Sequence, residues 1–299
     1  FTASGKRPFT HRIIVTTTNE WSVHAEESLR DQHIPVTKID LIALSESCID
    51  WAQFAKLKAP VIKPKKKPRS HQELALNAVV KGLSAADRGK LIMACGTGKT
   101  FTSLKIAETI AGKGKSVLFL VPSLSLLSQS LTEWRQESGI PLASFAVCSD
   151  GDIGKKRDKS DEDVETFMHE LRYPATTDAK RLYLSVTMRH ADDHMTVVFA
   201  TYHSIEVIHQ AQRLGMPAFD LILCDEAHRT TGSTFAGQED SPFVRVHNAA
   251  YIQGAKRLYM TATPRIFGKH AKETADVVLF GMDDESLYGK ELFVLNFSE

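Results

Sequence analysis

The stretch KLIMACGTGKTF at residues 90–101 constrains the fold more than any other part of the sequence. Its beginning predicts a strand, its glycine-rich centre a turn, and the segment from KTF onward a helix, which is the context of a phosphate-binding loop. Gly96 and Gly98 allow backbone conformations that other residues resist, so successive amides can converge on phosphate oxygens. The helix start at the same point adds a partial positive charge.

The residues of this loop predict how a nucleotide would bind. Thr97 lies between the two glycines, Lys99 would reach the β- and γ-phosphates, and the Thr100 hydroxyl would ligate magnesium. Met93 departs from the full G-x-x-x-x-G-K-[ST] pattern, which has glycine at this position. A short GKT sequence also occurs by chance, so an ordinary glycine-rich helix start is the alternative unless companion motifs follow.

The chain from about residue 70 alternates short apolar runs with amphipathic stretches. The runs are rich in Val, Leu and Ile without polar alternation, as parallel strands buried on both faces are. This pattern predicts an α/β domain with a doubly wound parallel sheet and helices on both faces. The expected strands are residues 90–94, 116–121, 144–148, 196–201, 221–225 and 257–261, with helices such as 100–111 and 124–137 between them. The charge-dense segment at 150–163 predicts a surface loop.

Two further motifs follow apolar strands. In FDLILCDEAHR, Asp225 would hold magnesium through its water shell and Glu226 would orient and deprotonate the attacking water. In RLYMTATPR, the hydroxyls of Thr261 and Thr263 can bond to His228 and to each other across neighbouring strand ends. The alternatives, an acidic helix start and a threonine-rich turn closed by proline, do not explain the order and spacing of these motifs.

Taken together, MACGTGKT, VPSLSLLSQ, DEAH and TATP resemble motifs I, Ia, II and III of superfamily 2 helicases and translocases, over roughly residues 69–263. The resemblance implies a RecA-like lobe that uses ATP and Mg²⁺. It implies that Gln72, in PRSHQELAL, reads the adenine edge. It also implies contacts with the nucleic-acid backbone, which carry no sequence information, from Pro122 and Ser123 of motif Ia and from Thr201 and Tyr202 in VFATYHSI.

Within that superfamily, LIMACGTGKT with MTATPR is most similar to the motor lobes of type I, type ISP and type III restriction enzymes. The first segment, PFTHRIIVTTTNEW followed by SCIDW, resembles the C-terminal part of an Mrr-like nuclease domain. It predicts a strand at residues 12–18, a helix at 25–32 and a β-rich run at 36–44. The nuclease family's carboxylate–lysine cluster is not found before Pro64, and Asp40 and Asp50 lack its spacing, so no nuclease site is assigned.

These patterns divide the chain into four parts. We expect an incomplete nuclease-type segment with a short α/β fold at residues 1–58, and a RecA-like ATP-binding lobe at 70–268. Between them, at 59–69, lies a linker rich in Pro and Lys, interpreted as a solvated spacer, with a phosphate-contacting strap as the alternative. Residues 269–299 are expected to lead toward a second lobe that this chain does not contain.

The function that the resemblance implies is ATP-dependent translocation or unwinding of DNA, duplex more than single-stranded. Its implied partners are a second RecA-like lobe, which supplies arginine fingers, and nuclease or methyltransferase regions of a longer chain. Without the second lobe, we expect nucleotide binding with slow hydrolysis. A DEAH-type RNA helicase and a nucleotide-gated nucleic-acid-binding switch are the alternatives.

Composition limits which ligands and which cell compartment fit this chain. The 299 residues carry a net charge of +1, so any nucleic-acid contact must come from local patches or backbone amides. The four cysteines form no C-x-x-C pair, which argues against structural zinc and fits free thiols in a reducing cytoplasm. No apolar run is long enough for a bilayer and no leader opens the chain, so we expect a cytoplasmic protein without a membrane partner. The start at Phe1 rather than Met suggests a fragment.

Overall fold

The computed structural model describes residues 36–148, 175–235, 241–265 and 277–296, together with residues 9, 11–18, 22, 24–25 and 34. The loop predicted at 150–163 lies outside the described residues. The same holds for residues 26–32 of the first predicted helix. Among the residues that are described, no helix is both long enough and apolar enough to cross a membrane.

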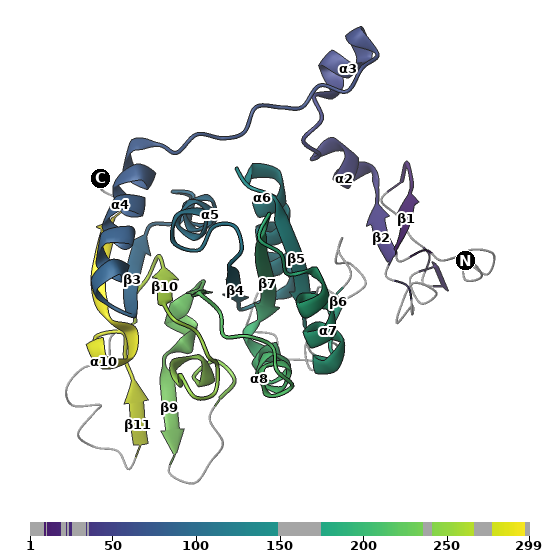
Figure 1. Ribbon diagram of the computed structural model, residues 1–299. Helices are drawn as coiled ribbons and strands as arrows, with labels where there is room; N and C mark the ends of the chain where they lie inside the picture. The colour runs from purple at the N-terminus through teal and green to yellow at the C-terminus, as the bar shows by residue number, and fades with distance from the viewer. Residues whose placement is uncertain are drawn as a thin grey trace.

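An eight-stranded sheet forms the centre of the lobe (Figure 1), in the order β12-β3-β10-β8-β4-β7-β5-β6. All neighbouring pairs are parallel. The strands are β3 Arg88–Met93, β4 Ser116–Val121, β5 Leu142–Val147, β6 Ala175–Thr176, β7 Met195–Thr201, β8 Leu221–Cys224, β10 Arg257–Thr261 and β12 Lys290–Leu295. The predicted parallel sheet is therefore confirmed.

Helices cover both faces of this sheet, also as predicted. Alternate strand residues point to opposite faces, so Phe119 packs in one core with Trp134, while Leu118 packs in the other with Ile205. The first core lies under α4 Ser70–Ala85, α5 Lys99–Ile110 and α6 Leu124–Glu137, and the second under α7 Ala179–Arg189 and α8 Ile205–Arg213. In the described part of the chain, short 3₁₀ turns also occur at η4 Tyr202–Ser204, η5 Ala227–Thr230 and η6 Arg245–His247.

The first segment forms a small unit of its own beside the lobe (Figure 1). Strand β1 (Arg12–Val15) pairs in parallel with β2 (Val36–Ile39). The predicted β-rich run at 36–44 ends at Ile39, because the Asp40 side chain accepts the Ala43 N–H and starts helix α2 (Leu41–Ser45). Asp50 caps α3 (Trp51–Leu57) in the same way. Asp40 and Asp50, the two acids that lack the spacing of the nuclease cluster, are therefore helix caps.

The chain after residue 268 returns to the lobe. Strand β11 (Val277–Phe280) pairs antiparallel with β9 (Gly232–Phe235), and α10 (Glu285–Tyr288) leads into β12. The β12 strand lies beside β3, where the buried Lys90 ammonium donates to the Met282 carbonyl at 2.8 Å. The sheet therefore does not end at residue 268 as expected, because KELFVL supplies its edge strand.

Candidate functional site

Three predicted motifs meet at one edge of the sheet because their strands are neighbours. The strand β10 lies between β3 and β8, with Thr261 opposite Ile92 and Tyr259 opposite Cys224. Parallel strands present their carboxyl ends at the same edge, which is where ligands bind in such sheets. The GTGKT loop, the DEAH segment and the TATP turn, which follow these three strands, therefore surround a common space.

The loop after β3 has the backbone geometry of an anion cradle. Gly96 and Gly98 adopt φ angles of +79° and +84°, the left-handed region that favours glycine. A Cβ atom on Gly98 would lie 2.3 Å from Nε2 of Gln72, so a larger residue at this position would displace the Gln72 amide. The Thr97 hydroxyl donates to the Ala94 carbonyl at 2.7 Å and closes the turn. The amides at the start of α5 can thus converge on a phosphate.

Lys99 begins α5 and reaches toward the neighbouring strand end. Its ammonium donates to the Met93 carbonyl at 3.3 Å and lies 4.0 Å from Oε1 of Glu226. Thr100 follows in the same turn, and its carbonyl accepts the Trp134 indole N–H at 3.1 Å. A phosphate placed between Lys99 and the loop amides would be stabilised by the Lys99 ammonium and by the partial positive charge at the start of α5.

Asp225 is the group that best fits a cation. It is 5% exposed, and its Oδ1 is buried without a hydrogen-bond partner among the described residues. Burial, and then the neighbouring Glu226 carboxylate, raise the pKa of Asp225 to about 6. Leaving a carboxylate oxygen buried and unpaired is costly, and a metal ion or its water would satisfy it. The carboxylate and hydroxyl oxygens of Asp225 and Thr100 are ligands that Mg²⁺ prefers, so the residues present fit this ion.

Glu226 lies at a strained turn, and its carboxylate contacts the imidazole of His228. Its φ of 47° is unusual for a residue with a side chain. Nδ1 of His228 lies 3.3 Å from Oε2 of Glu226 and 3.0 Å from Oγ1 of Thr261. The hydrogen bond to His228, and then the Lys99 charge, lower the pKa of Glu226. At neutral pH this carboxylate is therefore ionised, which suits it to accept a hydrogen bond from water.

The TATP turn connects to the same pair. Thr261 Oγ1 accepts the backbone N–H of Thr263 at 3.1 Å while it contacts His228. A shift of this turn would therefore alter the hydrogen bond that orients His228, and through it Glu226. A role of Thr261 and Thr263 in coupling this turn to Glu226 stays a prediction, and these hydrogen bonds support it.

Gln72 lies next to the phosphate loop. Its Nε2 donates to the Thr97 carbonyl at 3.0 Å, and its Oε1 accepts the Arg69 N–H at 2.9 Å. The side chain is 6% exposed and borders a cavity of about 380 Å³. This cavity adjoins Gly96–Gly98, so its place suits the adenosine part of a nucleotide. Adenine recognition by Gln72 stays a prediction and requires its amide to exchange partners.

Most of the residues that were expected to contact nucleic acid are buried in the structure. The side chains of Thr201 and Tyr202 are fully buried, which contradicts the expectation that they contact the nucleic-acid backbone. Thr201 bonds to Ser204 at 2.7 Å, and Tyr202 stacks on Phe243. Thr201 is the last residue of the fully buried strand β7, and Tyr202 belongs to the core under α7 and α8. Pro122 is buried as well, which contradicts its expected contact with nucleic acid. Ser123 is partly exposed and caps α6, so its contact with nucleic acid stays a prediction.

Tyr202 instead supports the candidate metal site, a role that the sequence analysis missed. Its hydroxyl donates to the backbone carbonyl of Asp225 at 2.8 Å. Burial raises the pKa of Tyr202 well above its usual value, so the hydroxyl stays protonated. The available signal was a tyrosine directly after a mostly apolar strand, because a buried tyrosine hydroxyl needs a partner.

We expect Tyr202→Phe to weaken Mg²⁺-dependent nucleotide binding by about five-fold. The variant leaves the buried Asp225 carbonyl without its donor, a loss of about 1–3 kcal/mol that is divided between folding and site geometry. Tyr251→Phe is the matched control, because Tyr251 donates to Glu206 away from the site. Calorimetric titration with and without Mg²⁺ measures the effect. Equal Mg²⁺ dependence in both variants would contradict it.

His247 lies behind the DEAH segment. Its ring nitrogens contact the Tyr259 hydroxyl at 3.0 Å and the Thr230 carbonyl at 3.2 Å, and Thr230 also bonds to Tyr288 at 3.0 Å. Burial lowers the pKa of His247 to about 4. This cluster ties α10, which precedes the edge strand β12, to the turn that carries Glu226 and His228.

The lowered pKa of His247 predicts acid sensitivity. Unfolded histidine takes up a proton near pH 6.5, whereas the folded group does so near pH 4. The stability that His247 contributes is thus complete above pH 6.5 and is lost as pH falls to about 4, by about 3 kcal/mol in free energy of unfolding. Denaturant unfolding from pH 7 to pH 4 should show a shallower loss for His247→Gln than for the control His190→Gln, at an exposed position. Parallel curves would refute this.

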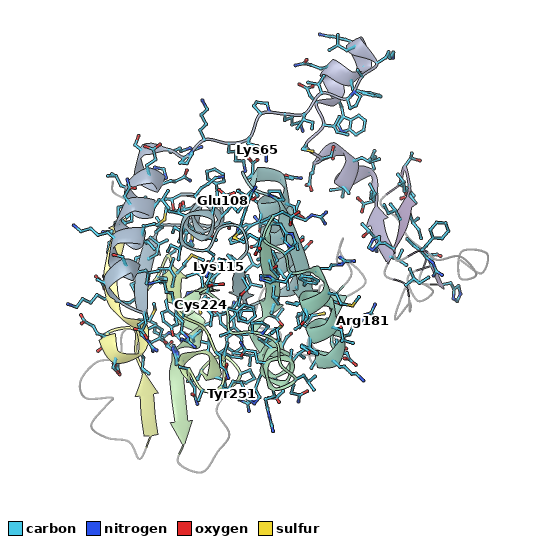
Figure 2. The ribbon with its side chains drawn as sticks, in the orientation of Figure 1. Lys65, Glu108, Lys115, Arg181, Cys224 and Tyr251 are labelled. Atoms are coloured by element: carbon cyan, nitrogen blue, oxygen red, sulfur yellow. The ribbon has the colours of Figure 1, made fainter. Side chains whose placement is uncertain are left out.

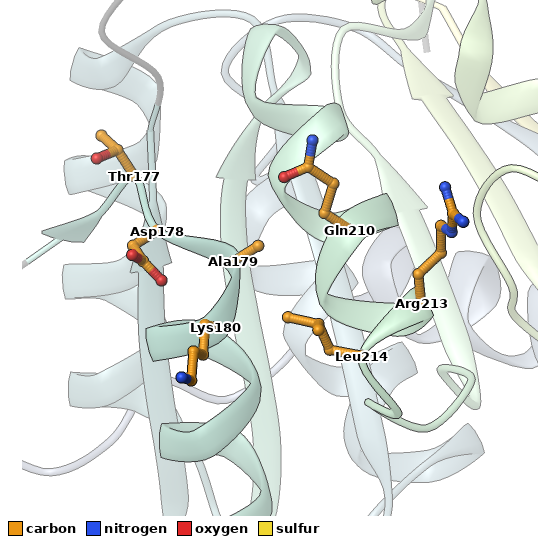
Figure 3. Close-up of a pocket in the computed structure, with 7 residues that line it drawn as sticks. All are labelled: Thr177, Asp178, Ala179, Lys180, Gln210, Arg213 and Leu214. Carbon is orange, nitrogen blue, oxygen red and sulfur yellow. The ribbon is translucent and has the colours of Figure 1, made fainter.

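A second cavity lies away from these motifs (Figure 3). It measures about 670 Å³ and lies between the start of α7 and the end of α8. Its lining residues are Thr177, Asp178, Ala179, Lys180, Gln210, Arg213 and Leu214. The Asp178 carboxylate already accepts the Arg181 N–H as the α7 cap, and we assign no ligand to this cavity.

Comparison with known proteins places these features in a family. Residues 65–266 match the family model described as "Type III restriction enzyme, res subunit", and residues 1–60 match one described as "Restriction endonuclease". A "Probable helicase" of African swine fever virus is 33% identical over 198 residues, which is 66% of this chain and 19% of the viral protein.

Two solved structures are similar as well. The ATP-dependent type ISP restriction-modification enzyme LlaBIII bound to DNA is 40% identical, with a TM-score of 0.79 over 98% of this chain and 19% of that one. A nuclease-deletion mutant of the type ISP enzyme LlaGI, in complex with a DNA substrate mimic, is 38% identical, with a TM-score of 0.59 over 78% of this chain and 20% of that one. The chain thus spans about a fifth of the length of these relatives.

Proposed function

The chain belongs to the family of the type III restriction enzyme res subunit, and on that premise we propose that it is the ATP-binding lobe of an ATP-dependent DNA translocase or helicase of a restriction-type enzyme. The observation that carries the proposal is the meeting of the glycine loop, the buried Asp225 and the Glu226–His228–Thr261 chain at one sheet edge. The chain is similar to type ISP enzymes whose structures contain DNA or a DNA mimic, and this supports DNA as the nucleic acid on which it acts.

In this proposal the nucleotide is held by its phosphates. The amides of Gly96–Gly98 and the start of α5 bind phosphate oxygens, and Lys99 adds a charge-assisted contact at the β- and γ-phosphates. Thr100 and Asp225 would hold Mg²⁺, which neutralises charge on the phosphate oxygens when it is bound. The raised pKa of Asp225 falls back when a cation binds beside it, so the carboxylate is ionised in the loaded site.

Glu226 acts on the attacking water. Its carboxylate is ionised and held by His228, so it first orients the water and then takes its proton. As the bond from the water oxygen to the γ-phosphorus forms, the bond from that phosphorus to the oxygen bridging the β-phosphate breaks, and ADP leaves. The contact of His228 with Thr261 links this step to the turn after β10. A second lobe, closing on the nucleotide, would complete the charge stabilisation, and alternating closure and opening would move the enzyme along DNA.

Nucleotide titration of the 299-residue chain tests the first part of the proposal. We expect Mg²⁺-dependent binding of ATP by calorimetry. Turnover by this chain alone should stay below about 1 s⁻¹, because arginine fingers from a second lobe are worth about 10³–10⁵ in rate. Absence of ATP binding would refute the assignment of the site. Fast turnover without any addition would refute the need for a second lobe.

A further inference from the structure

The linker at residues 59–69 is attached to the lobe rather than solvated along its whole length. The Lys66 ammonium lies 3.0 Å from Oε1 of Glu133, and the Lys66 backbone N–H donates to Oε2 of Glu137 at 2.6 Å. The neighbouring Lys65 donates to the Ser138 carbonyl, and Figure 2 shows Lys65 at the end of α6. Three contacts from the two consecutive residues Lys65 and Lys66 therefore fix the middle of the linker to the C-terminal end of α6.

The same part of the linker forms one wall of the candidate nucleotide cavity. Lys66, Lys67 and Arg69 line this cavity of about 380 Å³ opposite Gly96–Gly98. Among the described residues that line the cavity, Glu133, which pairs with Lys66, is the only one with a carboxylate. Three cations facing one anion give the lining a positive charge, which favours an anionic ligand.

The docking site on α6 also contacts the helix that carries Lys99 and Thr100. The Lys105 ammonium of α5 donates to the Glu137 carbonyl at 3.2 Å, and the Trp134 indole donates to the Thr100 carbonyl at 3.1 Å. Trp134 is fully buried. The linker, the end of α6 and the start of α5 thus form a continuous set of packed contacts around the cavity.

We propose that the linker is a wall of the nucleotide pocket and that its docking on α6 and the binding of ATP strengthen each other. This coupling rests on the proposed function, since it acts at the same site. A ligand that contacts the docked linker favours the docked state, and by reciprocity the docked linker raises the affinity for the ligand. The nuclease-like segment at residues 1–60 would then be held close to the lobe when ATP is bound.

Charge reversal on the linker tests whether docking of the linker raises the affinity for ATP. We expect Lys66→Glu to raise the Kd of the chain for Mg-ATP by about five-fold, because the reversed charge repels Glu133 and Glu137 and releases the wall. Lys63→Glu is the matched control. It carries the same charge change on the same linker, but Lys63 bonds to the Ser47 carbonyl and does not line the cavity. Equal Kd values for the two variants would overturn the proposal.

Limited trypsin digestion of the unmodified chain tests whether ATP binding favours the docked linker. Mg-ATP should slow cleavage after Lys65 and Lys66 by at least about five-fold relative to cleavage after Lys58, an exposed residue before the linker. Lys99→Ala should abolish this protection. Binding of ATP by calorimetry without protection of the linker would overturn the coupling alone. Failure to bind ATP at all would overturn both the proposed function and the coupling.

Discussion

Replacing Lys99 with alanine should weaken ATP binding by at least about 100-fold. The Lys99 side chain is 10% exposed and lies at the start of α5, where its charge adds to that of the helix N-terminus. Two charge-assisted hydrogen bonds to phosphate oxygens, at about 1.5–3 kcal/mol each, account for this loss. Calorimetric titration with Mg-ATP measures it.

The control for Lys99→Ala is Lys115→Ala, which removes an ammonium that pairs with Asp220 at 3.0 Å. We expect its ATP affinity to match that of the unmodified chain within about two-fold, because Lys115 is exposed and Asp220 partly exposed, and such surface pairs contribute little. Lys99→Ala should also keep its melting temperature without nucleotide. A Kd within ten-fold of the unmodified value would contradict the assignment of Lys99 to the phosphates.

Replacing Glu226 with glutamine should reduce the rate of ATP hydrolysis by about 10²–10⁴ while ATP binding changes by less than about three-fold. The substitution keeps the shape of the side chain but removes the carboxylate that accepts the proton of the attacking water. The rate must be measured in a version of the protein that carries a second lobe, by release of phosphate.

Glu206→Gln is the control for Glu226→Gln. Glu206 is a partly exposed carboxylate on α8, where the hydrogen bond from Tyr251 lowers its pKa, and it lies outside the candidate site. Its loss should leave the hydrolysis rate unchanged. A Glu226→Gln variant that hydrolyses ATP within ten-fold of the unmodified protein would show that another group activates the water.

The sequence predicted the sheet well and placed the three motifs directly after apolar strands, because both features depend on local patterns. The roles of the site residues stay predictions. Uninterrupted apolar runs identify buried parallel strands, and the motifs follow directly after them. The sequence predicted neighbouring ends for β8 and β10, and the structure adds that β10 lies between β3 and β8. The structure then adds what no motif states, such as the buried Oδ1 of Asp225 and the shared hydrogen bond at Thr261.

The errors arose where tertiary packing decides the outcome. Tyr202 follows β7 at the edge of the sheet that carries the site, but its ring faces the core because Phe243, from a distant segment, stacks on it. The edge strand β12 was missed because KELFVL begins with two charged residues and its partner β3 lies about 200 residues earlier. The linker docks because the carboxylates of Glu133 and Glu137 face it, which composition alone does not reveal.

The most direct test of the proposed function is ATP turnover by a version of the protein with both lobes. It would be measured with duplex DNA, single-stranded DNA, matched RNA and no polymer, with Glu226→Gln as the blank. The proposal predicts stimulation by duplex DNA that the blank lacks. Stimulation by RNA alone would contradict the assignment to DNA, and turnover that no polymer changes would contradict a translocase altogether.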